Sequence, residues 1–168
     1  NFGIIYGVSA FGLSNQTALN RTEAKALIET YYATYPKLSA FISDQIHFAR
    51  ENGYVKTISD RRRYLKDINS RNAVVRGAAE RNAVNAPIQG SAADVIKIAM
   101  IRIHDKLIEG NYKTKMLLQV HDELVFDVFK PEIDAIKAMI KSEMENAYSM
   151  RVPLDVEMDL GENWLEAH

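Results

Sequence analysis

The fold of this chain is decided by one stretch in its second half, residues 115–129, which reads KMLLQVHDELVFDVF. Its two apolar runs, 115–120 and 125–129, have strand length and are rich in residues that suit a half-buried pleated surface. The short segment between them leaves room only for a hairpin turn. We therefore predict a β-hairpin that presents two adjacent carboxylates, Asp122 and Glu123, at its tip.

An acidic hairpin tip admits two interpretations. Mg²⁺ takes oxygen ligands and is usually held by one or two carboxylates together with substrate phosphates, so a rigid tip carrying Asp122 and Glu123 suits a metal site. Aspartate also suits turn geometry without any further role. Either way, we predict that the Asp122 carboxylate is accessible to solvent.

The residues after the hairpin predict a helix and then a strand. Pro131 can open a helix, and apolar residues follow at core spacing: Ile133, Ile136, Ile140, Met144 and Ala147. After Pro153, apolar residues alternate with acidic ones over residues 154–160, which is typical of a strand with one buried face.

The residues before the hairpin predict mostly helices. Asn20 and Glu23 form a capping pair ahead of a helix, Pro36 opens a second helix, and Gly53 lies just past the end of that helix. A small hairpin is expected around residues 59–60.

A helical stretch follows from about residue 71 to residue 109, with an interruption near Pro87, where proline lacks a backbone donor and should bend or break the helix. Helices first and then an antiparallel sheet backed by helices make an α+β fold.

Composition and charge narrow the possible functions. The chain has 168 residues and no cysteine, which rules out disulfides and thiolate metal sites and permits a reducing compartment. No apolar run has membrane-spanning length, and no signal sequence is visible, so we expect no membrane partner and a cytoplasmic location. Because Asn1 begins inside an apparently structured segment, we expect a piece of a longer protein.

The net charge of −1 hides an uneven distribution. Residues 61–81 contain seven basic residues against two acidic ones, whereas residues 130–168 contain nine acidic residues against four basic ones. Such asymmetry indicates one face that meets a polyanion, although a solvated basic face is the plain alternative.

Three polar residues spaced four apart, Arg81, Asn85 and Gln89, form one stripe on a continuous helix. The DNA minor groove offers purine N3 and pyrimidine O2 acceptors at every base pair, so donors in a row can test duplex shape without reading sequence. The alternative is an exposed polar helix face. Phe2 and Tyr6 are also four apart, and such an aromatic pair is either core packing or a stacking platform for a base or sugar.

Together these segments resemble family A DNA polymerases, the bacterial DNA polymerase I type. Residues 1–7 (NFGIIYG) resemble the end of its nucleotide-binding helix, motif B, and residues 76–94 (RGAAERNAVNAPIQGSAAD) its palm helix pair. Residues 119–124 (QVHDEL) resemble motif C, and residues 161–168 (GENWLEAH) the customary C-terminus. The sequence departs from the family pattern at Asp60, where many relatives are expected to carry glycine.

The resemblance implies roles for particular residues. Asp122 matches a carboxylate that binds the two catalytic Mg²⁺ ions, with Glu123 in a supporting role. The other implied contacts are those of Gln119 and His121 near the primer terminus, Arg81, Asn85 and Gln89 on primer–template DNA, and Phe2 and Tyr6 at the incoming deoxynucleoside triphosphate.

The resemblance also implies what these residues lack. Motif A, with the other metal-binding aspartate, and the Arg and Lys that grip the triphosphate are absent, so we expect a fragment that is inactive without the remainder of the polymerase chain. Residues 1–70 would be part of the fingers and residues 71–168 most of the palm.

Two rival functions stay open. The first is a non-catalytic duplex DNA-binding module that uses the basic segment, with Asp122 and Glu123 as a plain turn. The second is a metal-dependent phosphohydrolase. It would need a third or fourth ligand, for which the acidic residues of 155–159 are the candidates.

Overall fold

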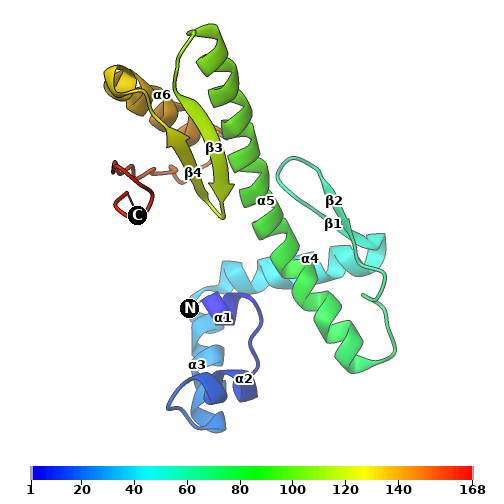
Figure 1. Ribbon diagram of the computed structural model, residues 1–168. Coiled ribbons are helices and arrows are strands. Elements are labelled where there is room, and N and C mark those ends of the chain that lie inside the picture. Colours follow the sequence, from blue (N-terminus) through cyan, green and yellow to red (C-terminus); the bar gives the residue numbers. More distant parts are fainter. Residues whose placement is uncertain (1, 168) are drawn as a thin grey trace. The chain divides into compact units, whose positions relative to one another are not determined.

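The computed structural model describes residues 2–167 and has an α+β fold, as predicted (Figure 1). The chain divides into two compact units, one ending at Ser91 and the other beginning at Ala92. No helix in the described range is long and apolar enough to cross a membrane.

The first unit begins with four helices: α1 (Phe2–Ile5), α2 (Ala10–Gln16), α3 (Arg21–Thr34) and α4 (Pro36–Asn52). The predicted caps are confirmed. The Asn20 side chain accepts from the Glu23 backbone N–H at 3.0 Å, and the Glu23 carboxylate accepts from the Asn20 N–H at 2.8 Å. Pro36 occupies the first turn of α4, and Gly53 ends this helix in the left-handed conformation, with φ 76°.

The strands β1 (Tyr54–Lys56) and β2 (Arg62–Tyr64) form the predicted small antiparallel hairpin. Asp60 has φ 60° in its turn, a conformation that glycine adopts at no cost, which explains why glycine suits this position. The hairpin packs on α4 and on the next helix through a core of small and branched residues: Ala49, Val55, Leu65, Ile68, Ala79 and Ala83.

Helix α5 (Ala73–Glu109) runs unbroken through Pro87, so the predicted interruption is wrong. Proline still cannot donate to the carbonyl of Ala83, but Ala79 and Ala83 are buried against the small hairpin and hold the preceding turns in place. Tertiary packing here outweighs the local cost of the proline.

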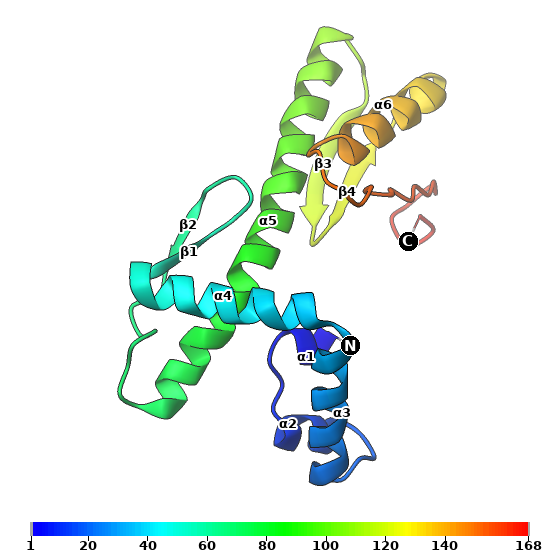
Figure 2. The ribbon, with the colours of Figure 1, turned by 180° about the vertical axis from the view of Figure 1, so that it is seen from behind.

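In the second unit, β3 (Lys115–Val120) and β4 (Glu123–Asp127) form the predicted hairpin. It is followed by a 3-10 turn, η1 (Lys130–Glu132). The helix α6 (Ile133–Glu145) comes next, and Figure 2 shows it from behind. The core lies between the later turns of α5, the hairpin and α6, and its buried residues are Ala99, Ile103, Leu107, Ile136, Ile140 and Ala147.

The strand predicted over residues 154–160 does not form. The burial alternation is present as far as Met158, which packs on the core of the second unit. However, the backbone groups of Val156 bond to side chains of α6: its N–H donates to the Glu145 carboxylate at 3.3 Å, and its carbonyl accepts from Lys141 Nζ at 3.2 Å. A segment bonded in this way is extended without belonging to a sheet.

Candidate functional site

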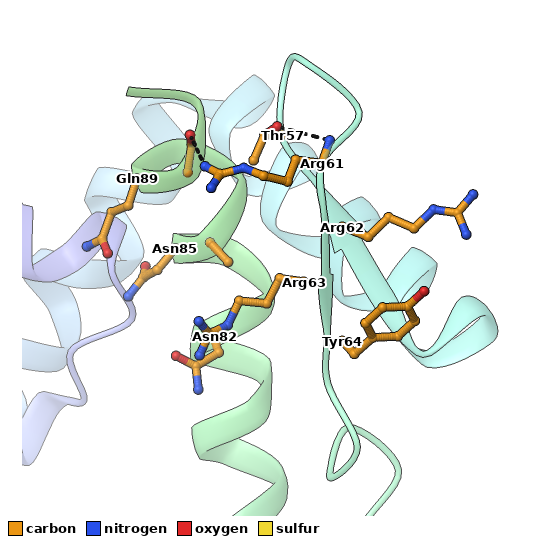
Figure 3. A pocket seen from close by; sticks show the side chains of 10 residues that line it. Thr57, Arg61, Arg62, Arg63, Tyr64, Asn82, Asn85 and Gln89 are labelled. Atoms are coloured by element: carbon orange, nitrogen blue, oxygen red, sulfur yellow. Dashed lines mark hydrogen bonds between the residues drawn. The ribbon is translucent and has the colours of Figure 1, made fainter. Parts of the chain in front are cut away.

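A groove of about 610 Å³ lies between the small hairpin and α5 in the first unit (Figure 3). We call it the basic groove, because three consecutive arginines contribute to its wall. The residues that line it are Thr57, Arg61, Arg62, Arg63, Tyr64, Asn82, Asn85, Ala86, Gln89 and Gly90.

The helical wall of the groove carries two of the three residues of the predicted stripe. Asn85 and Gln89 line the groove, and because α5 is unbroken they keep their shared face. Arg81 does not line it and instead lies beside Gly7, whose Cβ position would be 3.4 Å from Arg81 Cγ. Sequence reasoning missed Asn82, although its spacing of three from Asn85 and seven from Gln89 is the signal of a shared helix face.

Arg61 and Arg63 of the hairpin point toward α5, whereas Arg62 points away from it (Figure 3). Arg61 donates to the Gly90 carbonyl at 3.1 Å, and the Arg62 guanidinium lies 4.6 Å from the centroid of the Tyr54 ring. Arg63 extends toward Asn82, and within residues 2–167 no hydrogen bond or ion pair occupies its guanidinium.

One polar atom in the groove wall is buried without a partner. The Oδ1 of Asn85 has no hydrogen bond in the part of the chain that the structure describes. Leaving a buried acceptor unsatisfied costs about 1–3 kcal/mol, so a side chain held in this way is the kind of group that a ligand donor would satisfy.

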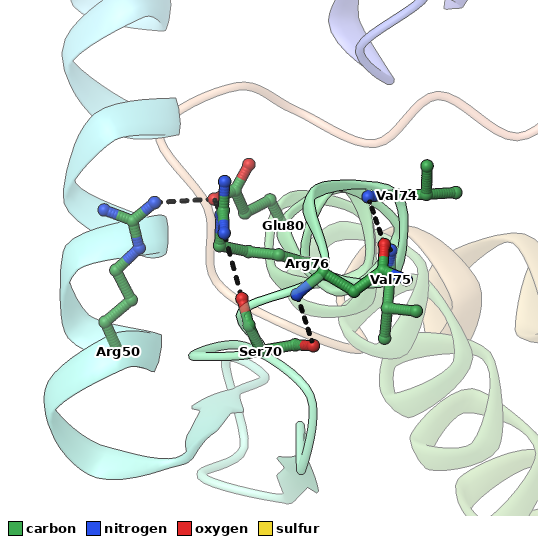
Figure 4. A network of polar contacts seen from close by, with 7 residues as sticks. Arg50, Ser70, Val74, Val75, Arg76 and Glu80 are labelled. Atoms are coloured by element: carbon green, nitrogen blue, oxygen red, sulfur yellow. Dashed lines mark hydrogen bonds and ion pairs between the residues drawn. The ribbon is translucent and has the colours of Figure 1, made fainter.

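Not every basic residue of the segment 61–81 belongs to the groove. Arg76 donates to the Ser70 carbonyl at 2.9 Å and lies 3.7 Å from the Glu80 carboxylate, which also accepts from Arg50 at 2.6 Å (Figure 4). Together with the Asn72 side chain, which accepts the Val74 N–H at 2.9 Å, these contacts fix the start of α5. The charge of Arg76 is therefore paired within α5, and it is Glu80 that joins α5 to Arg50 of α4.

We call the hairpin of β3 and β4 the large hairpin. Its tip is a turn of two residues, His121 and Asp122, between the paired residues Val120 and Glu123. His121 has φ 54° at the first central position, where a type II′ turn requires a positive φ. Asp122 is exposed, as predicted, and no hydrogen bond or ion pair holds its carboxylate within the described range. Glu123 is half-buried at the start of β4.

A β-bulge places Gln119. Met116 pairs with Phe126, but Leu118 pairs with Val125, so Leu117 is the extra residue of β3. A one-residue shift exchanges the two faces of a strand, and Gln119 therefore shares a face with its partner Leu124. The Gln119 amide donates to the His121 carbonyl at 2.8 Å and so braces the turn.

The aromatic pair near the start of the chain is only partly described. The side chain of Phe2 lies outside the described residues, and Tyr6 is half-buried in the turn after α1. That turn is a Schellman motif, in which Gly7 has φ 80° and the Val8 N–H donates to the Gly3 carbonyl at 2.8 Å.

The Tyr32 hydroxyl on α3 holds α1 by donating to the Ile4 carbonyl at 2.8 Å. Burial, and to a lesser extent the neighbouring Tyr31, raise the pKa of Tyr32. The hydroxyl therefore stays a protonated donor at neutral pH.

The phosphohydrolase alternative needs a third metal ligand beside the two tip carboxylates. Within residues 2–167, no three His, Asp or Glu side chains come together to hold a metal ion. The acidic residues of 155–159 therefore do not complete such a site.

Comparison with known proteins identifies the family of this chain. The sequence profile of DNA polymerase family A matches residues 1–166. DNA polymerase I of Streptococcus pneumoniae is 51% identical over 167 residues, which cover 99% of this chain and 19% of that protein. DNA polymerase I of Caldicellulosiruptor bescii is 49% identical over 166 residues, 99% of this chain and 20% of that protein.

A solved structure gives the same result. The POL domain of Pol1 from M. smegmatis, in complex with DNA primer-template and dNTP, superimposes with a TM-score of 0.96 at 42% identity. The match covers 99% of this chain and 29% of that one. The chain belongs to DNA polymerase family A. It spans about a fifth of the length of the curated relatives that it matches, and these are DNA polymerase I proteins.

Proposed function

We propose that this chain forms part of a DNA-directed DNA polymerase that extends a primer on a template with deoxynucleoside triphosphates. The observation that carries the proposal is the exposed Asp122 carboxylate on a two-residue hairpin turn, in a chain of family A. In this reaction the primer 3′-hydroxyl loses its proton to water and its oxygen forms a bond to the α-phosphorus, the bond from that phosphorus to the bridging oxygen breaks, and pyrophosphate leaves.

The residues at the tip fit Mg²⁺. Carboxylate oxygens are its preferred protein ligands, it is commonly held by one or two of them plus substrate phosphates, and Asp122 and Glu123 supply that number. When bound, a pair of such ions stabilises the attacking and leaving oxygens. Asp122 would be the principal ligand because it is exposed in the turn, and Glu123 the supporting one because it is half-buried in β4.

The remaining assignments concern substrate binding. Asn85 and Gln89 would contact the duplex from the helical wall of the basic groove, and Arg81 would contact it from beside Gly7. Gln119 and His121 would position the primer terminus, since both belong to the braced hairpin turn. Phe2 and Tyr6 would contact the incoming nucleotide, as the family resemblance implies.

We assign residues 1–70 to the fingers and residues 71–168 to the palm. Residues 1–168 alone should not extend a primer, because the family resemblance implies a second metal-binding aspartate, together with an Arg and a Lys that grip the triphosphate, and these residues lack all three. Activity should therefore be measured in a chimera in which residues 1–168 replace the matching segment of the Streptococcus pneumoniae DNA polymerase I.

The test is single-turnover primer extension by this chimera, next to a binding titration with the same primer–template. Asp122→Asn keeps the shape of the side chain but removes the charge that holds Mg²⁺, so extension should fall by at least about 10³-fold while DNA affinity stays within about twofold. Near-normal extension by the variant would contradict the polymerase assignment. Duplex binding without extension in the unsubstituted chimera would favour the non-catalytic DNA-binding module.

A further inference from the structure

The turn of the small hairpin, residues 57–61, is anchored on one turn of α5. The Ile58 N–H donates to Ser91 Oγ at 2.9 Å, and Ser91 Oγ in turn donates to the Pro87 carbonyl at 2.5 Å. On the other side of the turn, Arg61 donates to the Gly90 carbonyl at 3.1 Å. Two residues of the hairpin are thereby bonded to consecutive residues of the helix.

The missing side chain of Gly90 makes this contact possible. A Cβ built at Gly90 would lie 2.6 Å from Thr57 Cγ2, closer than real Cβ contacts come. Glycine in a helix interior is destabilising relative to alanine, so its presence here calls for a packing reason. The reason is that Thr57 lies directly against the helix backbone.

Thr57 also organises the turn itself. Its hydroxyl accepts from the backbone N–H groups of Ser59 and Arg61, both at 3.3 Å, and its N–H donates to the Arg61 carbonyl at 3.0 Å. The hairpin turn is therefore one bonded unit that rests on the helix at Gly90. A displacement at Gly90 would move the whole turn, together with the arginines that follow it.

We propose that Thr57, Gly90 and Ser91 are positioning residues that set the distance between the arginine-bearing strand β2 and the amide-bearing face of α5, and thereby the width of the basic groove. This inference rests on the proposed function, since the ligand of the groove is duplex DNA. Phosphate binding depends on how many cations reach the backbone at once, so a displaced strand should lose contacts without losing any charge.

The test measures the affinity of residues 1–168 for a short duplex oligonucleotide over a range of salt concentrations. Gly90→Ala should weaken binding by about tenfold and make the slope of log affinity against log salt shallower by about 1–2, as expected for the loss of one or two phosphate contacts. Ser91→Ala should weaken binding by about threefold, because only the hydroxyl link is lost.

The rescue variant separates positioning from damage to the fold. Thr57→Ser keeps the hydroxyl and removes the methyl group that would collide with a Cβ at position 90. The double variant Thr57→Ser with Gly90→Ala should therefore bind the duplex with an affinity within about twofold of that of the unsubstituted chain. Ser14→Ala is the matched control. The Ser14 hydroxyl also donates to a carbonyl of its own helix, that of Phe11, but no hydrogen bond from a distant element to it is present among the described residues.

The outcomes divide clearly. Unchanged affinity in both Gly90→Ala and Ser91→Ala, or no recovery in the double variant, overturns the positioning role while leaving the proposed function intact. If Gly90→Ala lowers the melting temperature, the positioning role is judged from Ser91→Ala alone. Weaker duplex binding by Ser91→Ala would then support the role, and unchanged binding would contradict it. A chain that binds no duplex before any substitution overturns this inference and the DNA-binding part of the proposed function together.

Discussion

The basic groove and the acidic tip of the large hairpin differ in how their side chains are held. In the groove, Arg61 bonds to a helix carbonyl and Arg62 lies over the Tyr54 ring. At the tip, Asp122 is exposed and has no hydrogen-bonding or ionic partner in the part of the chain that the structure describes. Two of the three groove arginines are thus held in place before any ligand arrives, with only Arg63 left unpaired among the described residues, whereas the principal carboxylate of the tip is unpaired.

This difference assigns different kinetic effects to the two regions. Fixed cations that hold a duplex act equally before and during the reaction, so changing them should alter affinity. A carboxylate that stabilises charge only as the bond forms should alter the rate of the chemical step. Substitutions in the groove and at the tip should therefore separate effects on DNA affinity from effects on the rate of extension.

The first prediction ranks the two carboxylates of the tip. In the chimera, Asp122→Asn should lower single-turnover extension by at least about 10³-fold and Glu123→Gln by only about tenfold. Asp122 lies in the turn, whereas Glu123 is paired with Val120 and half-buried, so the two side chains cannot approach one metal ion equally. An equal loss from both variants would contradict this ranking.

The second prediction concerns the stripe on α5. Residues 1–168 should bind duplex DNA without sequence preference, and contact with about five phosphates would give log affinity against log salt a slope of about −4 to −5. Arg81→Ala should make this slope shallower by about 1. Arg21→Ala, at an exposed position on α3, is the control that should leave the slope unchanged. Affinity that ignores both salt and Arg81→Ala would remove the DNA-binding role.

Much of the fold could be predicted from the sequence because the deciding interactions are local. The Asn20–Glu23 capping box and the Pro36 and Gly53 boundaries each involve residues a few positions apart, and all of them formed as predicted. The large hairpin also formed, because its two apolar runs are separated by a single short turn.

The predictions that failed depended on distant contacts. Pro87 should break a helix by local rules, but buried alanines hold the preceding turns against the small hairpin. Residues 154–160 have the pattern of a strand, but the Val156 backbone bonds to side chains of α6. The bulge at Leu117 could not be read from a run of apolar residues, because it changes no residue type and only shifts the register.

In the candidate site, too, the features that depend on local sequence could be predicted and those that depend on distant contacts could not. Asn85, Gln89 and Asp122 could be selected from spacing and residue chemistry, and the structure places the first two in the groove wall and the third in an exposed turn. The groove itself could not be foreseen. It depends on a glycine at position 90 and a serine hydroxyl at position 91, which admit and hold a hairpin that lies about 30 residues earlier in the chain.

The third prediction tests whether the backbone conformation of His121 at the tip lowers the free energy of unfolding. His121 has φ 54°, a conformation that costs a non-glycine residue about 1 kcal/mol or more. His121→Gly should therefore raise the free energy of unfolding of residues 1–168 by up to about 1 kcal/mol, measured by urea denaturation. In the chimera the same variant should extend primers more slowly, because the imidazole is lost.

A second left-handed residue provides the control for that experiment. Asn111 has φ 50° just beyond the end of α5, outside the tip. Asn111→Gly should raise the stability by less, since asparagine tolerates this conformation better than most residues, and it should leave extension unchanged. Faster extension by His121→Gly would show that the imidazole has no part in the reaction.

The last prediction concerns the base of the large hairpin, far along the strands from its tip. Glu132 accepts from the backbone N–H of Lys113 at 3.0 Å, and it also accepts from the Thr114 N–H at 3.0 Å and the Thr114 hydroxyl at 2.8 Å. The Lys113 N–H is the main reason that the pKa of Glu132 lies below its ordinary value of 4.5, and the Thr114 bonds contribute further.

A lowered pKa in the folded state fixes the sign of the pH dependence. The stabilisation by Glu132 is fully present above pH 4.5, and it is lost as the pH falls through the lower folded value, because the folded state then has to bind a proton that the unfolded state already carries. The free energy of unfolding, followed through the fluorescence of the single tryptophan, Trp164, should therefore fall below pH 4.5. Glu132→Gln should be less stable at neutral pH and should lose less stability on acidification, whereas Glu157→Gln, at an exposed position, should behave like the unsubstituted chain. If Glu132→Gln kept the full acid-dependent loss, the carboxylate would not be what holds the base of the hairpin, and the rigidity of the tip would have to come from the Gln119–His121 bond and the bulge alone.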